Sequence, residues 1–362
     1  MRTVGVEEEL LLVDPDSGDP KALAAAVLAR AEQDDPEQDV FEKELFGQML
    51  EFATHPQSDM ASLGEEIARC RKEAARHAGE IGCGVAALAS SPLPVSPSLS
   101  MNERYRWLAE RYGVPTREQL VCGCHVHVSV ESDEEGVAVL DRLRPWLPVL
   151  RAISANSPFW QGRDTGYGSY RSRVWNRWPS AGPTELFGSP ERYHRRVADM
   201  VATGVILDEA MAYFDARLSA RYPTVELRVA DVCLSAETAV FIATLSRALV
   251  ETAARDWRAG RPAPDHSVSV LRLADWQAAR YGLEGELLDP VTLRQRPAEK
   301  VLRSLLEHTG DALTATGDAE RAEQAVADLV RHGNGAREQR RLMERTDSLR
   351  SVVTECVRRT QG

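Results

Sequence analysis

Features that mark several large classes of protein are missing from this sequence of 362 residues. It contains no apolar run that approaches the length of a membrane-spanning helix, and its first residues lack the charged-then-apolar layout of a signal peptide. Its formal net charge of −11 argues against a surface that binds nucleic acid or anionic lipid without specificity. We therefore expect a cytoplasmic protein with no nucleic-acid or membrane partner.

Cysteine is also scarce, and the six cysteines show no spacing typical of a disulfide framework. Two cysteines close together, Cys122 and Cys124 in the stretch "CGC", suggest a pair of zinc ligands. Both cysteines, however, share a strand face with Val126, Val128 and Val130 when side chains alternate. This placement favours buried core thiols.

Two kinds of catalytic signature are absent as well. The sequence has no GxxxxGK[ST] loop to cradle phosphates, so a bound nucleotide must be held through metal ions and arginines. It also has no GxSxG or activated-cysteine signature, which argues against a reaction that needs a protein nucleophile.

No internal repeat or long Gly/Ser linker divides the chain, and we expect one catalytic domain over residues 1–362. Periodicity predicts strands at about 3–13, 48–54, 84–89, 121–131 and 224–231. It predicts helices at about 21–34, 59–81, 135–155, 190–215 and 236–258, with a mostly helical C-terminal third after about 297. Strands of a buried parallel sheet are apolar on both faces, which these strands are not, so an antiparallel sheet is favoured.

The stretch "VGVEEELLLVD", residues 4–14, places three glutamates inside an otherwise hydrophobic strand. Glu7 and Glu9 share one face with Leu11, whereas Glu8 falls on the face of the valines. Taken alone, this pattern is equally compatible with a solvated edge strand. The choice depends on whether the pattern recurs.

Three other predicted strands also have one apolar and one polar face. The polar faces of "GQMLEFAT", "CHVHVSV" and "TVELRVAD" carry Glu51, then His125 with His127, then Glu226 with Arg228. A lone HxH pair is more often structural than a ligand, but its occurrence with three acidic strands indicates one shared acidic face.

Carboxylates that converge on one face repel each other unless cations lie between them. Mg²⁺ or Mn²⁺ suits such a site, because these ions prefer carboxylate oxygens with an occasional imidazole. Mg²⁺ also shares its coordination shell with nucleotide phosphates.

Five ordered motifs resemble the glutamate–cysteine ligase type 2 family, the bacterial carboxylate–amine ligases: "GVEEELLLVD", "ELFGQMLEFAT", "CGCHVHVSV", "SPFWQGRDTGYGSYRSRVW" and "TVELRVAD". The resemblance extends to the C-terminal "HGNGAREQRRLMERT". It implies an α+β, glutamine-synthetase-like fold, with a curved antiparallel sheet, helices packed on one face and a funnel for ATP and divalent cations. It also implies ATP-dependent amide formation, in which the γ-carboxylate of glutamate is phosphorylated before cysteine or another amine attacks.

The resemblance assigns roles to individual residues. Arg228 matches the arginine that faces the transferring phosphoryl group, and the metal ligands implied are Glu7, Glu9, Glu51, His125 and Glu226. Related ligases place an Asp ligand where this chain has Glu44, and odd spacing puts Glu44 on the opposite strand face from Glu51 unless the chain bends. Glu8 matches no such role, and we expect it to be solvated or paired with a helix.

An irregular segment between "SANSP" and "FGSPERY" is rich in arginine and aromatic residues. Long loops of this kind are frequently lids or binding loops. The resemblance favours Arg171 as a substrate or phosphate contact, and the residues that we predict to contact the nucleotide are Arg163, Arg173 and Tyr170, with Tyr167 and Arg177 as further candidates. The alternative is a surface loop that its arginines make soluble.

The sequence leaves two other functional classes open. A guanidino kinase uses a comparable sheet to transfer phosphate without forming an amide, and a non-catalytic protein that binds metal or nucleotide is the second alternative. For the ligase we expect small amino-acid and amine substrates as partners, and the sequence leaves a homodimer open.

Overall fold

The structure, a computed structural model, describes residues 1–35, 40–100 and 102–361. Within these ranges an antiparallel sheet of seven strands has the order β2-β3-β1-β5-β9-β8, with β4 also paired to β1. Its strands are β1 (Val4–Val13), β2 (Phe41–Lys43), β3 (Met49–Ala53), β4 (Gly84–Ala86), β5 (Gly123–Ser129), β8 (Ala216–Leu218) and β9 (Thr224–Asp231). Two small hairpins add β6 (Phe159–Trp160) with β7 (Arg163–Asp164), and β10 (Glu286–Leu288) with β11 (Gln295–Pro297).

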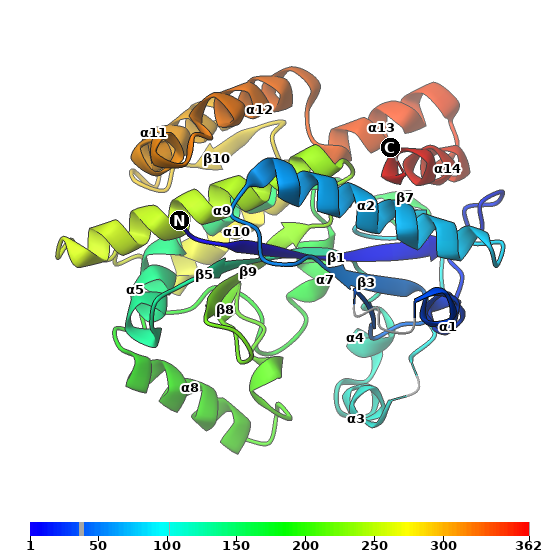
Figure 1. Cartoon of the computed structure of the whole chain (residues 1–362), viewed down its shortest axis with the longest axis horizontal. Helices are drawn as coiled ribbons and strands as arrows, with labels where there is room; N and C mark the ends of the chain where they lie inside the picture. The colour runs from blue at the N-terminus through cyan, green and yellow to red at the C-terminus, as the bar shows by residue number, and fades with distance from the viewer. Residues whose placement is uncertain (36–39, 101, 362) are drawn as a thin grey trace.

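Helices α2 and α9 cover one face of this sheet, and α3, α4, α7 and α8 lie on the opposite side (Figure 1). The helices are α1 (Ala24–Asp34), α2 (Met60–Gly79), α3 (Glu103–Tyr112), α4 (Val114–Arg117), α5 (Asp133–Leu143), α6 (Leu147–Ser154), α7 (Arg171–Trp175), α8 (Pro190–Ala202), α9 (Ala236–Arg258), α10 (Val268–Tyr281), α11 (Ala298–Thr316), α12 (Ala319–His332), α13 (Gly335–Thr346) and α14 (Leu349–Thr360). No helix in the described ranges is both long and apolar enough to cross a membrane. The α+β class with an antiparallel sheet is confirmed.

All five predicted strands are present, but two predicted helices have different bounds. The helix predicted at 135–155 is divided into α5 and α6, because Pro145 interrupts it and Pro148 fits only the first turn of a new helix. The helix predicted at 190–215 begins as expected, with the Ser189 side chain accepting from Arg192 N, but it ends at Ala202. Gly204 follows with a positive φ of 66°, which directs the chain away from the helix.

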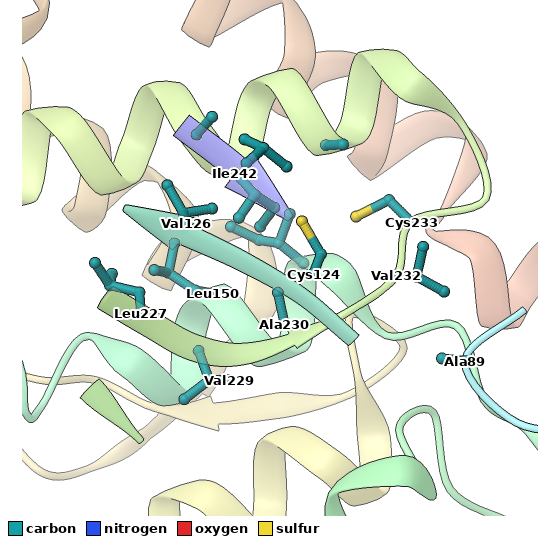
Figure 2. Packing of buried hydrophobic residues seen from close by; sticks show 14 of the residues in the cluster. Ala89, Cys124, Val126, Leu150, Leu227, Val229, Ala230, Val232, Cys233 and Ile242 are labelled. Carbon is teal, nitrogen blue, oxygen red and sulfur yellow. The ribbon is translucent and has the colours of Figure 1, made fainter. Parts of the chain in front are cut away.

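The apolar faces of the central strands pack beneath α9 to form the core. Figure 2 shows Cys124 and Val126 of β5 directed toward Ile242 of α9, with Cys233 close to Cys124. All six cysteines are free and buried. The interpretation of Cys122 and Cys124 as core thiols is therefore confirmed.

One expected position on β9 is wrong because of a β-bulge. Unbroken alternation along "TVELRVAD" predicts that Val229 shares a face with Val225 and Leu227. The register between β5 and β9 shifts between Cys124 and Val126, so that one residue of β5 opposes two of β9. Val229 therefore lies on the side of β9 turned away from Cys124 and Ile242 (Figure 2).

Glu8 is fully buried beneath α2, with 0% of its surface exposed. Its carboxylate accepts two hydrogen bonds from Arg71 of α2, from Nε and Nη2, each 2.8 Å long. Arg71 also donates to the carbonyl oxygens of Cys233 and Leu234. The expectation of pairing with a helix is confirmed, and that of solvation is wrong.

Candidate active site

A cavity of about 810 Å³ opens on the sheet face that α2 and α9 leave uncovered. Its lining includes polar side chains of four adjacent strands: Glu7, Glu9, Glu51, His125, His127, Glu226 and Arg228. The predicted acidic face therefore exists, and it forms the floor of this cavity.

Strand register sets which of these side chains meet. Glu7 of β1 is opposite His125 of β5, and Glu9 is opposite Glu51 of β3. On the other side of β5, His127 is opposite Glu226 of β9. Since opposite residues have neighbouring Cβ atoms, each polar side chain has another one beside it across a strand boundary.

Glu7 lies between the two histidines of β5. Its Oε2 is 3.3 Å from His125 Nδ1, and its Oε1 is 3.1 Å from His127 Nε2. Burial alone would raise the pKa of Glu7, but the imidazoles hold this pKa well below its usual range. Burial and the nearby Arg228 lower the pKa of His125 to about 4, which leaves its ring neutral and able to bind a metal ion.

Glu9, Glu44 and Glu51 form a cluster with too little positive charge nearby. Burial and the charge of Glu44 raise the pKa of Glu9 to about 7. Burial, followed by Glu44, also raises the pKa of Glu51 well above its usual value. At neutral pH these carboxylates therefore hold protons, unless a bound cation takes the place of the protons.

Glu44 joins this cluster through a reversal of the chain, not through a strand face. It directly follows β2, and the chain turns back to begin β3 at Met49. Glu44 consequently lines the cavity and lies within hydrogen-bond reach of Glu51. The bend that sequence spacing required is present.

Glu226 is held by two arginines. Arg217 of β8 is opposite Glu226 in the register, and its Nε lies 2.6 Å from Glu226 Oε2. Arg228 contacts the other carboxylate oxygen. Although burial raises the pKa of Glu226, Arg228 and Arg217 lower it to about 2. Sequence reasoning missed Arg217, because β8 was not predicted.

The floor of the cavity fits divalent cations. Two groups have ligand atoms within 4.8 Å of one another: Glu7 with Glu51 and His125, and Glu7 with His127 and Glu226. His125 Nε2 is buried and has no hydrogen-bond partner among the described residues. An unpartnered imidazole nitrogen among carboxylates matches the donors that Mn²⁺ or Mg²⁺ accepts. His127 was predicted to lie on this face but was not named as a ligand, although its HxH spacing was the available signal.

Arg171 lies behind the floor of the cavity, outside the lining that the described residues form. It is 1% exposed, and its Nη1 is 3.9 Å from Asp231 Oδ1. Gly123 makes room for it, since a Cβ on Gly123 would stand 2.2 Å from Arg171 Nη2. Its charge lowers the pKa of Glu9, so its influence on the site is electrostatic. The predicted contact of Arg171 with substrate or phosphate stays a prediction.

The other predicted loop residues also lie outside the cavity lining. Arg163 is exposed on β7, and Arg177 pairs with Glu118 at 2.6 Å. Arg173 Nη2 is 3.5 Å from Asp275, while Tyr170 packs against the rings of Trp160 and Tyr167. The nucleotide contacts predicted for Arg163, Arg173 and Tyr170 remain predictions that this cavity does not support.

An aromatic wall, which sequence reasoning missed, closes one side of the cavity. It consists of Tyr105, Trp175, Trp178 and Tyr213, with Arg104 beside them. Trp175 and Tyr213 have ring centroids 5.1 Å apart, and Trp178 and Tyr213 5.8 Å apart. For Trp175 and Trp178 the signal in the sequence was the concentration of aromatic residues in the irregular segment, whereas Tyr105 and Tyr213 lie outside that segment.

Comparison with solved structures defines the class of fold. The glutamate–cysteine ligase of Francisella tularensis, solved in complex with AMP, aligns with a TM-score of 0.69 and 13% identity, covering 99% of this chain and 88% of that chain. A bifunctional glutathione synthetase from Pasteurella multocida aligns with a TM-score of 0.72 and 15% identity, covering 99% of this chain and 52% of that chain. The chain has the fold of glutamate–cysteine ligases.

Sequence comparison identifies the family. The family model described as "Glutamate-cysteine ligase family 2" matches residues 3–355. Over 362 residues, and over the full length of both chains, the sequence is 77% identical to the "Putative glutamate--cysteine ligase 2-1" of Streptomyces avermitilis and 73% identical to the "Putative glutamate--cysteine ligase 2" of Streptomyces coelicolor. The chain belongs to glutamate-cysteine ligase family 2, and the resemblance drawn from its five motifs is confirmed.

Proposed function

We propose that this protein is an ATP-dependent carboxylate–amine ligase that joins the γ-carboxylate of glutamate to cysteine or another amine. The observation that carries the proposal is the floor of the cavity, where carboxylates and imidazoles from four strands converge beside two arginines. Membership of glutamate-cysteine ligase family 2 supports the same reaction class.

The reaction has two steps. A substrate carboxylate oxygen attacks the γ-phosphorus of ATP, which gives an acyl phosphate and releases ADP. The amine then attacks the acyl carbon, an amide C–N bond forms as the bond from that carbon to the phosphate oxygen breaks, and the nitrogen loses a proton. Inorganic phosphate leaves with the former carboxylate oxygen. Neither step needs a protein nucleophile, in agreement with the absence of such a signature from the sequence.

The acidic residues of the floor would hold Mg²⁺ or Mn²⁺. These ions, when bound, neutralise charge on the ATP phosphates and bring them close to the substrate carboxylate. Glu7, Glu9, Glu51, His125 and Glu226 are the proposed ligands, with Glu44 and His127 beside them.

Arg228 is proposed to stabilise the phosphoryl group during its transfer. Its guanidinium lies on the cavity floor, carries a permanent positive charge and offers donors in a fixed plane. Preorganised donors of this kind are most effective where negative charge develops in the transition state.

A phosphate-release screen tests the proposal. Purified protein is incubated with ATP, Mg²⁺ or Mn²⁺, and a matrix of carboxylic acids and amines, and products are identified by mass spectrometry. We expect ADP and phosphate only when a carboxylate and an amine are both present, with a γ-glutamyl amide as product. The Glu51→Gln variant, prepared identically, controls for contaminating ATPases.

Two results would contradict the proposal. With a guanidino compound added as acceptor, ADP formation and a phosphoguanidine product would identify a guanidino kinase. Binding of Mn²⁺ without any ATP turnover across the matrix would favour a non-catalytic protein.

A further inference from the structure

Trp175 contacts two arginines, Arg228 of the cavity floor and Arg171 behind it. The guanidinium carbon of Arg171 lies 5.5 Å from the centre of the Trp175 ring, and that of Arg228 lies 5.7 Å from it. Both distances are within the range at which a cation is attracted to an aromatic face, and tryptophan gives the strongest attraction of this kind. Trp175 is therefore the side chain that the two arginines share.

Hydrogen bonds alone leave the two guanidinium groups incompletely held. The Nε atoms of Arg171 and Arg228 are both buried, and neither has a hydrogen-bond partner among the described residues. Arg228 is anchored at Nη1 by Glu226. Glu226 itself is shared with Arg217 and belongs to one of the groups that could hold a cation.

A ring face orients an arginine in a different way from a carboxylate. A carboxylate partner occupies N–H donors and cancels charge, whereas an aromatic face attracts the cation and leaves its in-plane donors free. If Glu226 turns toward a metal ion, Trp175 still holds Arg228 in place. The donors of Arg228 are then available for a phosphoryl group.

The fold keeps the Trp175 ring in a fixed position. Trp175 ends α7, four residues after Arg171, so both side chains lie on the same face of the helix. Its ring packs against Tyr213, which in turn packs against Trp178. A ring confined in this way has little freedom to tilt away from the arginines.

We propose that Trp175 is a positioning residue that aligns Arg228 for phosphoryl transfer through its ring face, a role that rests on the function proposed above. Trp175 acts through Arg228 and does not itself contact the transferred group. Its loss should slow turnover and leave the binding of substrates and metal unchanged.

The test compares Trp175→Leu, Trp175→Phe and a matched control, Trp257→Leu, which removes a half-exposed tryptophan of α9 outside the cavity. In Trp175→Leu we expect kcat to fall about 10- to 30-fold, the range expected from losing a desolvated cation–π contact, with KM for ATP and Mn²⁺ affinity within about 3-fold of wild type. Trp175→Phe should recover most of the loss, because phenylalanine keeps a ring face. Trp257→Leu should match wild type.

A second measurement does not depend on turnover. In protein labelled with ¹⁵N-arginine, the Nε–H signals of Arg171 and Arg228 should be shifted upfield by the ring, and they are assigned by their loss in Arg171→Lys and Arg228→Lys. The Arg228 signal should lose this shift in folded Trp175→Leu.

Three outcomes overturn the proposal: an unchanged Arg228 signal, a kcat of Trp175→Leu within about 3-fold of wild type, or a raised KM with unchanged kcat, which would mean that the ring binds substrate. Wild-type protein without ATP turnover would instead overturn the proposed function, and the Arg228 signal would still decide whether Trp175 orients the arginine.

Discussion

Neighbouring glutamates on β1 occupy opposite faces of the sheet and differ in how their charge is balanced. Glu8 lies beneath α2, where Arg71 gives its carboxylate two hydrogen bonds of 2.8 Å. Glu9 lies on the cavity floor near Glu44 and Glu51, and burial together with Glu44 raises its pKa to about 7. Both residues are buried, with 0% and 6% exposure. Burial alone therefore does not distinguish a structural carboxylate from a functional one.

The difference lies in the partner that each environment supplies. A buried carboxylate is tolerated when an arginine neutralises it and satisfies its oxygens, as Arg71 does for Glu8. The cluster of Glu9, Glu44 and Glu51 has fewer positive charges than it needs, so its stable state requires protons or cations. One face of β1 thus packs into the fold, and the other lines the cavity.

The largest effect is expected for Glu51→Gln on the cavity side. The change is nearly isosteric and removes the charge of a proposed metal ligand, so ATP turnover should be lost. Because the repulsion from Glu44 is also relieved, the metal-free variant should unfold at the same temperature as wild type or higher. Turnover near the wild-type level at saturating Mn²⁺ would show that Glu51 is not a ligand.

The same substitution on the helix-covered side, Glu8→Gln, should have the opposite consequence. It leaves Arg71 buried without its counter-charge, and the free energy of unfolding should fall by about 3–5 kcal/mol. Folded Glu8→Gln should still turn over ATP at a rate close to wild type. Denaturant unfolding and turnover measured on both variants reveal whether the two faces are truly different.

Arg228→Lys tests the arginine on the cavity side. Lysine keeps the charge but offers no planar pair of donors, so turnover should fall by roughly 10²–10³-fold while Mn²⁺ affinity changes little. If Arg228 only neutralises Glu226 as an ion pair, lysine should substitute with a modest loss. Turnover within a few-fold of wild type would show that Arg228 does not stabilise the transition state.

A smaller effect is expected in the core itself. Cys124 is 0% exposed and packs toward α9, so Cys124→Ala should lower the free energy of unfolding by about 1–2 kcal/mol. The folded variant should keep its turnover and its bound metal. If the folded variant lost its turnover or its bound metal, the Cys124 thiol would lie on the cavity side of β5, which would contradict the register of this strand.

The convergence of Glu7, Glu9, Glu51 and His125 could be predicted because it depends only on the alternation of side chains along strands. Their pairing across strands could not, since register is set by the whole sheet. The β-bulge at Arg228 and Val229 likewise has no local signature, because it arises where β9 meets β5.

The loop residues show why residue type is a weaker guide than a strand face. The resemblance favours Arg171 as a substrate or phosphate contact, which stays a prediction; in the structure its backbone N–H donates to Ser157 and its side chain lies near Asp231, behind the cavity. Arg217 and Trp175 reach the site from a strand and a short helix that were not predicted. Long-range contacts, which no sequence pattern encodes, decide which polar side chains of a loop face a ligand.

The thermal stability of metal-free protein as a function of pH tests most directly whether the cluster of Glu9, Glu44 and Glu51 has too little positive charge nearby. The pKa of Glu9 in the folded protein, about 7, lies above the ordinary value of 4.5, so the folded state binds this proton more tightly than the unfolded chain does. Stability from this group is complete below pH 4.5 and is lost as pH rises through about 7.

His125 acts in the opposite direction below about pH 6.5, because burial and Arg228 lower its pKa from 6.5 to about 4 and the folded state gains stability as that proton is lost from the unfolded chain. In the presence of a chelator, the unfolding temperature of wild-type protein should therefore fall between about pH 6.5 and pH 7.5, and less so in Glu51→Gln. Added Mn²⁺ should restore the wild-type unfolding temperature at about pH 7.5 but not that of Glu51→Gln. An unfolding temperature that rises or stays level over this range, and that Mn²⁺ does not change, would contradict a shortage of positive charge around Glu9, Glu44 and Glu51.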